Sequence, residues 1–346
     1  MTLELVARIA AVVVGITTAL WFLASAVRTM VIPRPERVWL TMTAFTAARA
    51  LAHRLGQRSE SPEVRHRILG SFAPVVLISL PVVWSLGVIV AFSGIFWGLT
   101  GGEFSADLEL SGSSLTTLGF TAAPTFLTRV VAVVEALCGL ALIALVIAFL
   151  PTLYTTFSRR EIAVGRLTTR AGEPPTPAEF LIRLEAIDRL EQVGDRWEEW
   201  EEWFVELGET HTSFPALIYF RSARPGRSWL TAAETALDTA SVVTATGMIA
   251  STGQAETMIR SGYLALRMIA DFYQIPPELP PSARSQISVT RTQFDILLEK
   301  LRVGGIQLDI DPDEAWSNFA GWRVNYDHSL EGLKTLVAEV PAHWDV

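Results

Sequence analysis

Residues 111–120, SGSSLTTLGF, have the composition in this chain that is best suited to binding an ion. The segment is short and rich in Ser and Thr, and it lies between two long apolar runs. It is too polar to cross a bilayer, but it can enter one where protein or water covers its backbone. If residues 107–116 form a helix that points into the membrane, its C-terminal dipole favours a cation there. Carbonyl oxygens of the residues that follow could replace the cation's hydration shell.

Three apolar runs, residues 9–27, 71–97 and 130–154, must position this segment. Each is long enough to span a bilayer, and Glu135 is the one charged residue inside them. The chain of 346 residues has 18% charged residues and a mean hydropathy of +0.34. These values are high for a wholly soluble protein and low for a wholly membranous one, so we expect a membrane part followed by a soluble part.

The charges predict how these spans are oriented. Between residues 28 and 69 there are eight arginines and three glutamates, so by the positive-inside rule this segment is cytoplasmic. The charged residues in the loop after the second span are all acidic until Arg129, and the third span is followed by Arg159 and Arg160. We therefore expect a multi-pass protein of the plasma membrane, with its N-terminus outside and its C-terminal domain in the cytoplasm.

Within the basic segment, apolar residues recur at helical spacing beside arginines. They are Val38, Met42, Phe45, Leu51 and Leu55. This pattern predicts an amphipathic helix, for which two positions remain open. It could lie along the inner leaflet of the lipid bilayer, or it could pack on the soluble domain.

With its flanking spans, the polar segment resembles the pore module of the tetrameric potassium-channel superfamily. The order of outer helix, pore helix, TTLGF filter and inner helix covers about residues 70–160, under a third of the chain. Arg129 lies at the outer start of the inner helix, and Gly139 falls where those channels often have a gating-hinge glycine. The resemblance implies a homotetramer, because one chain supplies only one pore loop.

The resemblance also assigns roles to individual residues. Thr117 would offer a hydroxyl and a carbonyl to the ion, and Gly119 would adopt a positive φ that a side chain resists. The ion filter would comprise Thr117, Leu118, Gly119, Phe120 and Thr121, and the pore helix would contain Ser113, Ser114 and Thr116. No resident cofactor or metal is implied beyond the permeant cation.

The chain departs from the family pattern at the outer end of the filter. The family continues Gly-Tyr/Phe-Gly-Asp, whereas this chain has Gly119, Phe120, Thr121 and Ala122. Thr121 at positive φ would cost about 1–3 kcal/mol, and Ala122 cannot brace the filter as a carboxylate does. Ser113 stands where many members have a second acid. We therefore expect a channel for monovalent cations, with K⁺ as the permeant ion and Na⁺ as an alternative, rather than strict K⁺ selectivity.

Glu135 is a second candidate for function. A carboxylate at the centre of a span costs at least about 2.5 kcal/mol and usually marks a functional site. It could face the pore cavity, brace the filter from behind, or pair with a Ser or Thr of the pore helix. The sequence leaves these alternatives open.

The C-terminal half reads as a helical domain without catalytic chemistry. Residues 158–346 contain 18 Lys and Arg against 28 Asp and Glu, which argues against nucleic acid as a partner. Neither Glu209 with His211 nor Asp327 with His328 has the spacing of a metal site. The acidic residues 311–314 are best explained as a helix N-cap with Pro at the first position, rather than as a calcium loop. No nucleophile and base stand out, so we do not expect an enzyme.

Together these features predict an all-α membrane protein with three transmembrane helices, a re-entrant pore helix and filter loop between spans two and three, and an all-α cytosolic domain. The expected segments are a first transmembrane helix (1–31), a basic cytoplasmic linker with the amphipathic helix (32–69), the pore module (70–160), a linker (161–176) and the helical cytosolic domain (177–346). The expected function is a homotetrameric monovalent cation channel. The alternative is a non-conducting membrane-anchored scaffold or signalling protein that retains the pore-module fold.

Overall fold

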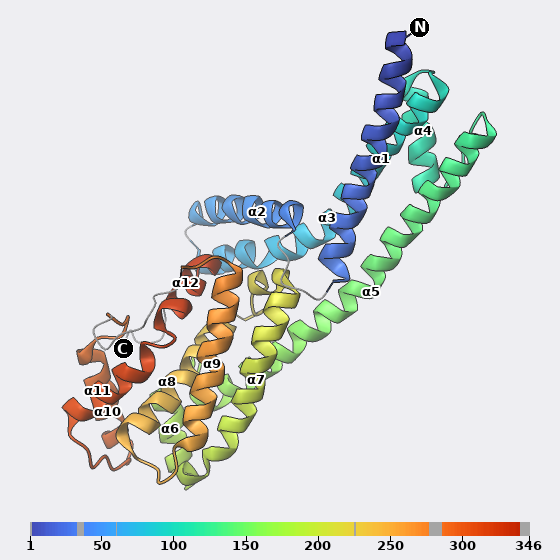
Figure 1. Cartoon of the computed structure of the whole chain (residues 1–346). Coiled ribbons are helices and arrows are strands. Elements are labelled where there is room, and N and C mark those ends of the chain that lie inside the picture. The colour runs from blue at the N-terminus through green and yellow to red at the C-terminus, as the bar shows by residue number, and fades with distance from the viewer. Residues whose placement is uncertain (1, 33–37, 60, 225, 277–285, 340–346) are drawn as a thin grey trace. The chain divides into compact units, whose positions relative to one another are not determined.

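The computed structural model describes residues 2–32, 38–59, 61–224, 226–276 and 286–339. All regular secondary structure in these ranges is helical, and they contain no strand (Figure 1). Three of the helices are long and apolar enough to cross a membrane. The chain divides into two compact units, Met1–Arg58 with Ser71–Tyr154, and Ser59–Gly70 with Thr155–Val346. The prediction of an all-α protein with three candidate spans is therefore confirmed.

The three candidate spans lie in α1 (Thr2–Met30), α3 (Pro62–Thr100) and α5 (Phe126–Ala171). Each helix extends beyond its apolar run. The largest extension is in α5, which continues to Ala171 through most of the range 161–176 that the sequence predicts as a linker. Helical hydrogen bonding needs only good helix formers, so the charged residues that end the apolar run do not end the helix. Pro74, Pro81 and Pro151 lie inside these helices without ending them.

In the first unit, α1 packs antiparallel to α3 with close contact between the two backbones. A Cβ built on Gly15 would lie 2.5 Å from the carbonyl oxygen of Ala91, so a side chain there would force the helices apart. Near the end of α3, the Arg8 guanidinium donates to the carbonyl oxygens of Gly98 and Leu99 at 3.0 and 2.8 Å. A cation at a helix C-terminus is favourable because it satisfies free carbonyls at the negative end of the dipole.

The amphipathic segment forms α2 (Trp39–Gln57), which also belongs to the first unit. Phe45 and Ala52 are buried, whereas Trp39, Leu51 and Leu55 are exposed. Thr41 shares a 2.8 Å hydrogen bond with Thr29 of α1, and this contact ties α2 to the first span. Arg34 and Arg37 of the predicted basic linker lie outside the described residues. Both predicted positions for this helix stay open.

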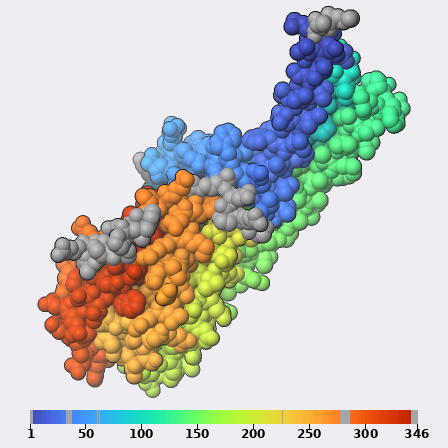
Figure 2. All heavy atoms as spheres, viewed as in Figure 1, coloured from blue at the N-terminus to red at the C-terminus, as the bar shows by residue number. Residues whose placement is uncertain are grey.

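The second unit is a bundle built around one central helix. It contains α6 (Pro177–Ala186), the short helices η1 (Leu190–Gln192) and η2 (Pro215–Tyr219), α7 (Gly194–Ser213), α8 (Trp229–Thr246), α9 (Gly253–Phe272), α10 (Arg291–Val303), α11 (Pro312–Arg323) and α12 (Asp327–Val337). Every residue of α8 except Thr244 is buried, and α6, α7, α9, α11 and α12 pack around it (Figure 1). The most extensive pairing is between α7 and α9, and in Figure 2 the yellow-green atoms of the first region lie beside the orange atoms of the second.

Local sequence signals explain where several of these helices begin and end. The Ser228 side chain caps α8 by accepting from the Leu230 amide, and Gly247 ends the same helix with φ at 61°. The Asp311 side chain accepts a hydrogen bond from the Asp313 amide, and Pro312 is the first residue of α11. The segment 311–314 therefore caps this helix, as predicted. The helical pattern over residues 178–207 is interrupted between α6 and α7, where Asp188 has a φ of 55°.

The core of the second unit contains a group of buried charges around Arg323. Its guanidinium lies 2.6 Å from the Asp238 carboxylate, 2.9 Å from that of Glu234 and 2.7 Å from that of Asp327. Lys334 completes the group with a 2.7 Å ion pair to Glu234. Burial opposes the charge on Arg323, but the three carboxylates outweigh it and raise the pKa of Arg323 well above its usual value. The central helix can therefore bury two acids because α11 and α12 supply the cations.

A second buried cation, Arg160, connects α5 to the bundle. Its guanidinium donates to the carbonyl oxygens of Leu217 and Phe220 at 3.0 and 2.6 Å, and it lies 3.3 Å from His211 Nε2. The other ring nitrogen of His211 lies 3.0 Å from the Leu207 carbonyl oxygen, so Nδ1 donates there and Nε2 accepts from Arg160. Burial and the neighbouring Arg160 charge lower the pKa of His211 to about 3.

We predict that Arg323→Ala destabilises the second unit by about 3–5 kcal/mol, because it leaves several buried carboxylates without their shared cation. The measurement is chemical denaturation followed by tryptophan fluorescence. Arg302→Ala is the matched control. Among the described residues, the Arg302 side chain forms only an exposed 3.7 Å pair with Glu299, so this substitution should cost under about 1 kcal/mol. Equal effects of the two substitutions would contradict a structural role for the buried charges.

We also predict that the second unit loses stability as the pH falls below about 6.5, the ordinary pKa of histidine. Unfolded His211 binds a proton in this range while folded His211 does not, so His211 contributes a loss of about 1.4 kcal/mol per pH unit down to its folded pKa. Denaturation midpoints between pH 7.5 and 5.5 test this, because His211→Gln should show a shallower decline than the wild type. Parallel declines would show that other groups govern the acid sensitivity.

Candidate functional site: a short helix and loop between two apolar helices

The polar segment forms a short helix, α4 (Phe104–Leu115), followed by a loop at residues 116–125. α4 turns back alongside α3, because Asp107 accepts hydrogen bonds from Thr100 at the end of α3 while Ser111 reaches Ile89, three turns earlier. The Ser111 hydroxyl lies 2.9 Å from the Ile89 carbonyl oxygen. The expected short helix therefore exists between the second and third apolar helices.

Glu135 holds α4 against α5 from the opposite side. Its side chain is fully buried, and one carboxylate oxygen forms a very short hydrogen bond with the Ser111 hydroxyl. The other oxygen, Oε2, has no hydrogen-bond partner among the described residues. Of the alternatives that the sequence leaves open for Glu135, this geometry corresponds to pairing with a serine of the short helix. Ser111 thereby connects α3, α4 and α5.

Gly139 permits the closest contact in this site. A Cβ built at Gly139 would lie 2.1 Å from the carbonyl oxygen of Leu115, the last residue of α4. Gly139 follows Phe126 by thirteen residues, so the end of α4 lies about 20 Å along α5 from its first residue. Residues 116–125 can extend over about 33 Å, enough to return to the start of α5. α4 therefore contacts both α3 and α5, and the loop is long enough to connect its end to Phe126.

The loop begins by folding back onto α4. The amides of Leu118 and Gly119 both donate to the carbonyl oxygen of Ser113, at 3.1 and 3.2 Å. Thr117 and Gly119 have positive φ values of 59° and 68°. Gly119 thus adopts the backbone region that the resemblance implies, whereas the strained non-glycine residue is Thr117 rather than Thr121. The amide of Thr121 instead donates to the Ser113 hydroxyl at 3.2 Å. The backbone at Thr121 therefore differs from the positive-φ conformation that the resemblance implies for this position.

Four successive carbonyl groups of this loop have no hydrogen-bond partner in the described part of the chain, whereas those of Ala123 and Thr125 accept hydrogen bonds from Arg129. Among the described residues, no hydrogen bond uses the carbonyl oxygens of Thr117, Leu118, Gly119 and Phe120. The side chains of Leu118 and Phe120 are 70% and 62% exposed, which is unusual for large apolar groups. One chain by itself therefore presents four successive backbone acceptors and two exposed apolar side chains that a neighbouring molecule could cover.

α5 has a buried face and an exposed face, and the two differ in composition. The buried face contains Thr128, Glu135, Gly139 and Leu142, at the spacing of one helix side. After Arg129, the large exposed side chains of α5 up to residue 147 are apolar, and they include Val133, Leu137, Leu140, Ile143 and Ile147. This exposed face suits lipid or another copy of the chain, and the buried face positions α4.

The structure brings most of the predicted site residues together, although not all of their side chains take part in the site. The hydroxyls of Ser114 and Thr116 bond to carbonyls of their own helix, at 2.8 and 2.6 Å. Ser113 joins α4 to Thr121 through its side chain. The sequence left a Ser or Thr of the short helix open as a partner of Glu135 but did not identify Ser111, and it missed the contact between Gly139 and the Leu115 carbonyl.

The remaining candidates from the sequence show structural contacts. His211 binds Leu207 and Arg160, and the Nε2 atom of His328 lies 2.7 Å from the Pro276 carbonyl oxygen. Asp327 pairs with Arg323. In the part of the chain that the structure describes, no group of three His, Cys, Asp or Glu side chains could hold a metal ion.

Comparison with protein-family models, with curated proteins and with solved structures finds no match to this chain. The resemblance to a pore module rests on the residues of the loop and its flanking helices.

We predict that Gly139→Ala displaces α4 and lowers the stability of the first unit, because the new methyl group meets a backbone carbonyl that cannot rotate away. The cost should be about 1–3 kcal/mol, as for other overpacked contacts. Gly112→Ala is the matched control, since a Cβ at Gly112 meets nothing within 4 Å. Thermal unfolding of the full chain in detergent measures both. A Gly139→Ala protein as stable as Gly112→Ala would contradict the close contact.

Proposed function

We propose that this protein is a monovalent cation channel that assembles as a homotetramer around the loop at residues 117–121. The observation that supports it most is the set of free carbonyl oxygens at Thr117, Leu118, Gly119 and Phe120, directly after a short helix held between two apolar helices. Carbonyl rings of this kind can replace the hydration shell of a cation. Four copies are proposed because one loop cannot surround an ion.

The electrostatics of α4 support a cation rather than an anion. The C-terminal end of a helix carries partial negative charge, and the loop with the free carbonyls follows this end. The acidic residues before it, Glu103, Asp107 and Glu109, would raise the local concentration of cations. K⁺ is the proposed permeant ion, with Na⁺ as the alternative.

The exposed apolar groups support assembly in a lipid bilayer. Leu118, Phe120 and Phe126 are exposed in the single chain, as is the apolar face of α5. Packing against neighbouring copies would cover these surfaces by close van der Waals contact and would bring four loops together. In this proposal the protein lies in the plasma membrane, with its N-terminus outside and the helical second unit in the cytoplasm, as the distribution of arginines indicates.

A second candidate is a non-conducting membrane-anchored scaffold or signalling protein with the same helix arrangement. It is favoured by the outer part of the loop, where the Thr121 amide bonds to Ser113 and no acid follows at Ala122. The mass of the purified assembly in detergent separates the two candidates. A tetramer favours the channel, and a monomer or dimer favours the scaffold.

We expect the purified full chain to give single-channel currents in a planar bilayer with K⁺ on both sides. Failure to observe current in either K⁺ or Na⁺ at any voltage would rule out the channel. Ser111→Ala changes a residue that holds α4 against α3 and α5 and leaves the loop itself unchanged. It should reduce the number of active channels because it removes the hydroxyl that contacts both Ile89 and Glu135.

Selectivity gives a separate prediction. Thr121→Gly should move the reversal potential in mixed K⁺ and Na⁺ toward the K⁺ equilibrium potential, because glycine can adopt the positive φ that threonine resists. Ala123→Gly, two residues further along the same loop, is the control and should leave the reversal potential unchanged. If Thr121→Gly conducts with an unchanged reversal potential, then Thr121 does not limit selectivity.

A further inference from the structure

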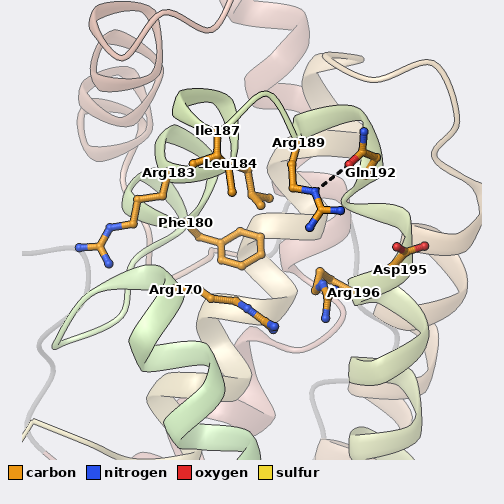
Figure 3. Close-up of a pocket in the computed structure, with 9 residues that line it drawn as sticks. All are labelled: Arg170, Phe180, Arg183, Leu184, Ile187, Arg189, Gln192, Asp195 and Arg196. Atoms are coloured by element: carbon orange, nitrogen blue, oxygen red, sulfur yellow. Dashed lines mark hydrogen bonds between the residues drawn. The ribbon is translucent and has the colours of Figure 1, made fainter.

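A cavity of about 160 Å³ lies within the second unit, between the end of α5, α6 and the start of α7. Four arginines line it, and Figure 3 shows how they point. The guanidinium groups of Arg170, Arg189 and Arg196 lie toward the same space, whereas that of Arg183 points away from it (Figure 3). Three convergent cations are unusual in a half-chain with 18 Lys and Arg against 28 Asp and Glu.

The cations of this cavity are only partly neutralised by the protein. Arg189 donates to the neutral side chain of Gln192 at 2.9 Å. Arg170 and Arg196 share one carboxylate, that of Glu199, at 3.7 and 2.5 Å. Asp195 is the one acid that lines the cavity itself. Three guanidinium groups therefore face two nearby carboxylates, and the balance leaves a positive site.

The turn between α6 and α7 creates this arrangement. Asp188, with a φ of 55°, ends the helical pattern and directs Arg189 toward the cavity. α7 then begins at Gly194 without a side-chain cap, and Arg196 lies in its first turn. The positive end of the α7 dipole adds to the three cations and favours an anion.

The other wall of the cavity is apolar. Phe180, Leu184 and Ile187 line it, and Phe180 is fully buried with its ring 5.2 Å from that of Trp200. Ile187 is 63% exposed, so the cavity opens to solvent on this side. A volume of about 160 Å³ is below the range of sites that enclose drug-sized ligands, about 300–1,000 Å³.

We propose that this cavity binds the phosphate group of a small phosphomonoester with a short apolar or aromatic part. The forked donors of Arg170, Arg189 and Arg196 match the geometry of phosphate oxygens, and the apolar wall would hold the organic part. The phosphate could belong to a soluble molecule or to a lipid headgroup. This proposal does not depend on ion conduction.

Titration calorimetry on the full chain in a neutral detergent, at constant ionic strength, tests the proposal with phenyl phosphate and inorganic phosphate as probes. Phenyl phosphate should bind more tightly, because only this probe can contact the wall of Phe180 and Leu184. Arg189→Gln should weaken its binding by about tenfold or more, the effect of losing one charge-assisted contact. Arg189 is exposed, and within the described ranges its side chain bonds only to Gln192, so this variant should remain folded.

Arg183→Gln is the matched control, because Arg183 lines the same cavity but its guanidinium points away to Glu179 and Thr169. It should bind phenyl phosphate as the wild type does. A second arm replaces the soluble probe with phosphatidic acid in nanodiscs, detected by native mass spectrometry. Binding of phenyl phosphate identifies a soluble ligand, and binding of phosphatidic acid alone identifies a headgroup, provided that Arg189→Gln weakens it. No binding of either probe, or equal losses in Arg189→Gln and Arg183→Gln, would overturn the proposal.

Discussion

The contact between the Leu115 carbonyl and Gly139 sets the depth at which α4 stops, and the rest of the first unit depends on it. Ser111 and Glu135 fix the same helix one turn away, so α4 is held against both α3 and α5. After α4 the helix does not continue, because Thr117 and Gly119 take positive φ values. The loop turns back on Ser113, and its next carbonyl groups are left without partners within the chain. The candidate ion site is thus a result of where a helix ends.

The two units solve the problem of buried polar groups in opposite ways. In the described part of the first unit, the carboxylate of Glu135 is fully buried, and a single serine hydroxyl binds one of its two oxygens. The second unit buries Glu234 and Asp238 on its central helix and gives them Arg323 and Lys334 as counter-ions. A bilayer does not supply water to a poorly paired group, so few polar groups are the cheaper solution there. A bundle with an acidic surface can carry a complete ionic network instead.

Hydropathy and capping residues were enough to predict the three long helices, the helical character of the second unit and the N-cap at Asp311. They could not predict that α5 continues to Ala171, because charge ends an apolar run without ending a helix. They also could not predict the break at Asp188, where a non-glycine residue takes a positive φ. For the site, the loop and Glu135 were visible as unusual residues in an apolar context. A Ser or Thr of the short helix was one of the predicted partners of Glu135, but Ser111 itself and the contact of Gly139 were not identified, because these contacts join different helices.

The burial of α8 on all sides has a consequence for how relatives of this chain could be recognised. A helix enclosed by five others has no face on which side chains can change without disturbing a neighbour. Substitutions during evolution should therefore accumulate on the exposed sides of the surrounding helices and leave α8 nearly constant. The acids four residues apart at Glu234 and Asp238, with Arg323 and Asp327 at the same interval, form a signature that distant relatives would retain. This signature would persist even where the exposed loop after α4 had diverged beyond recognition.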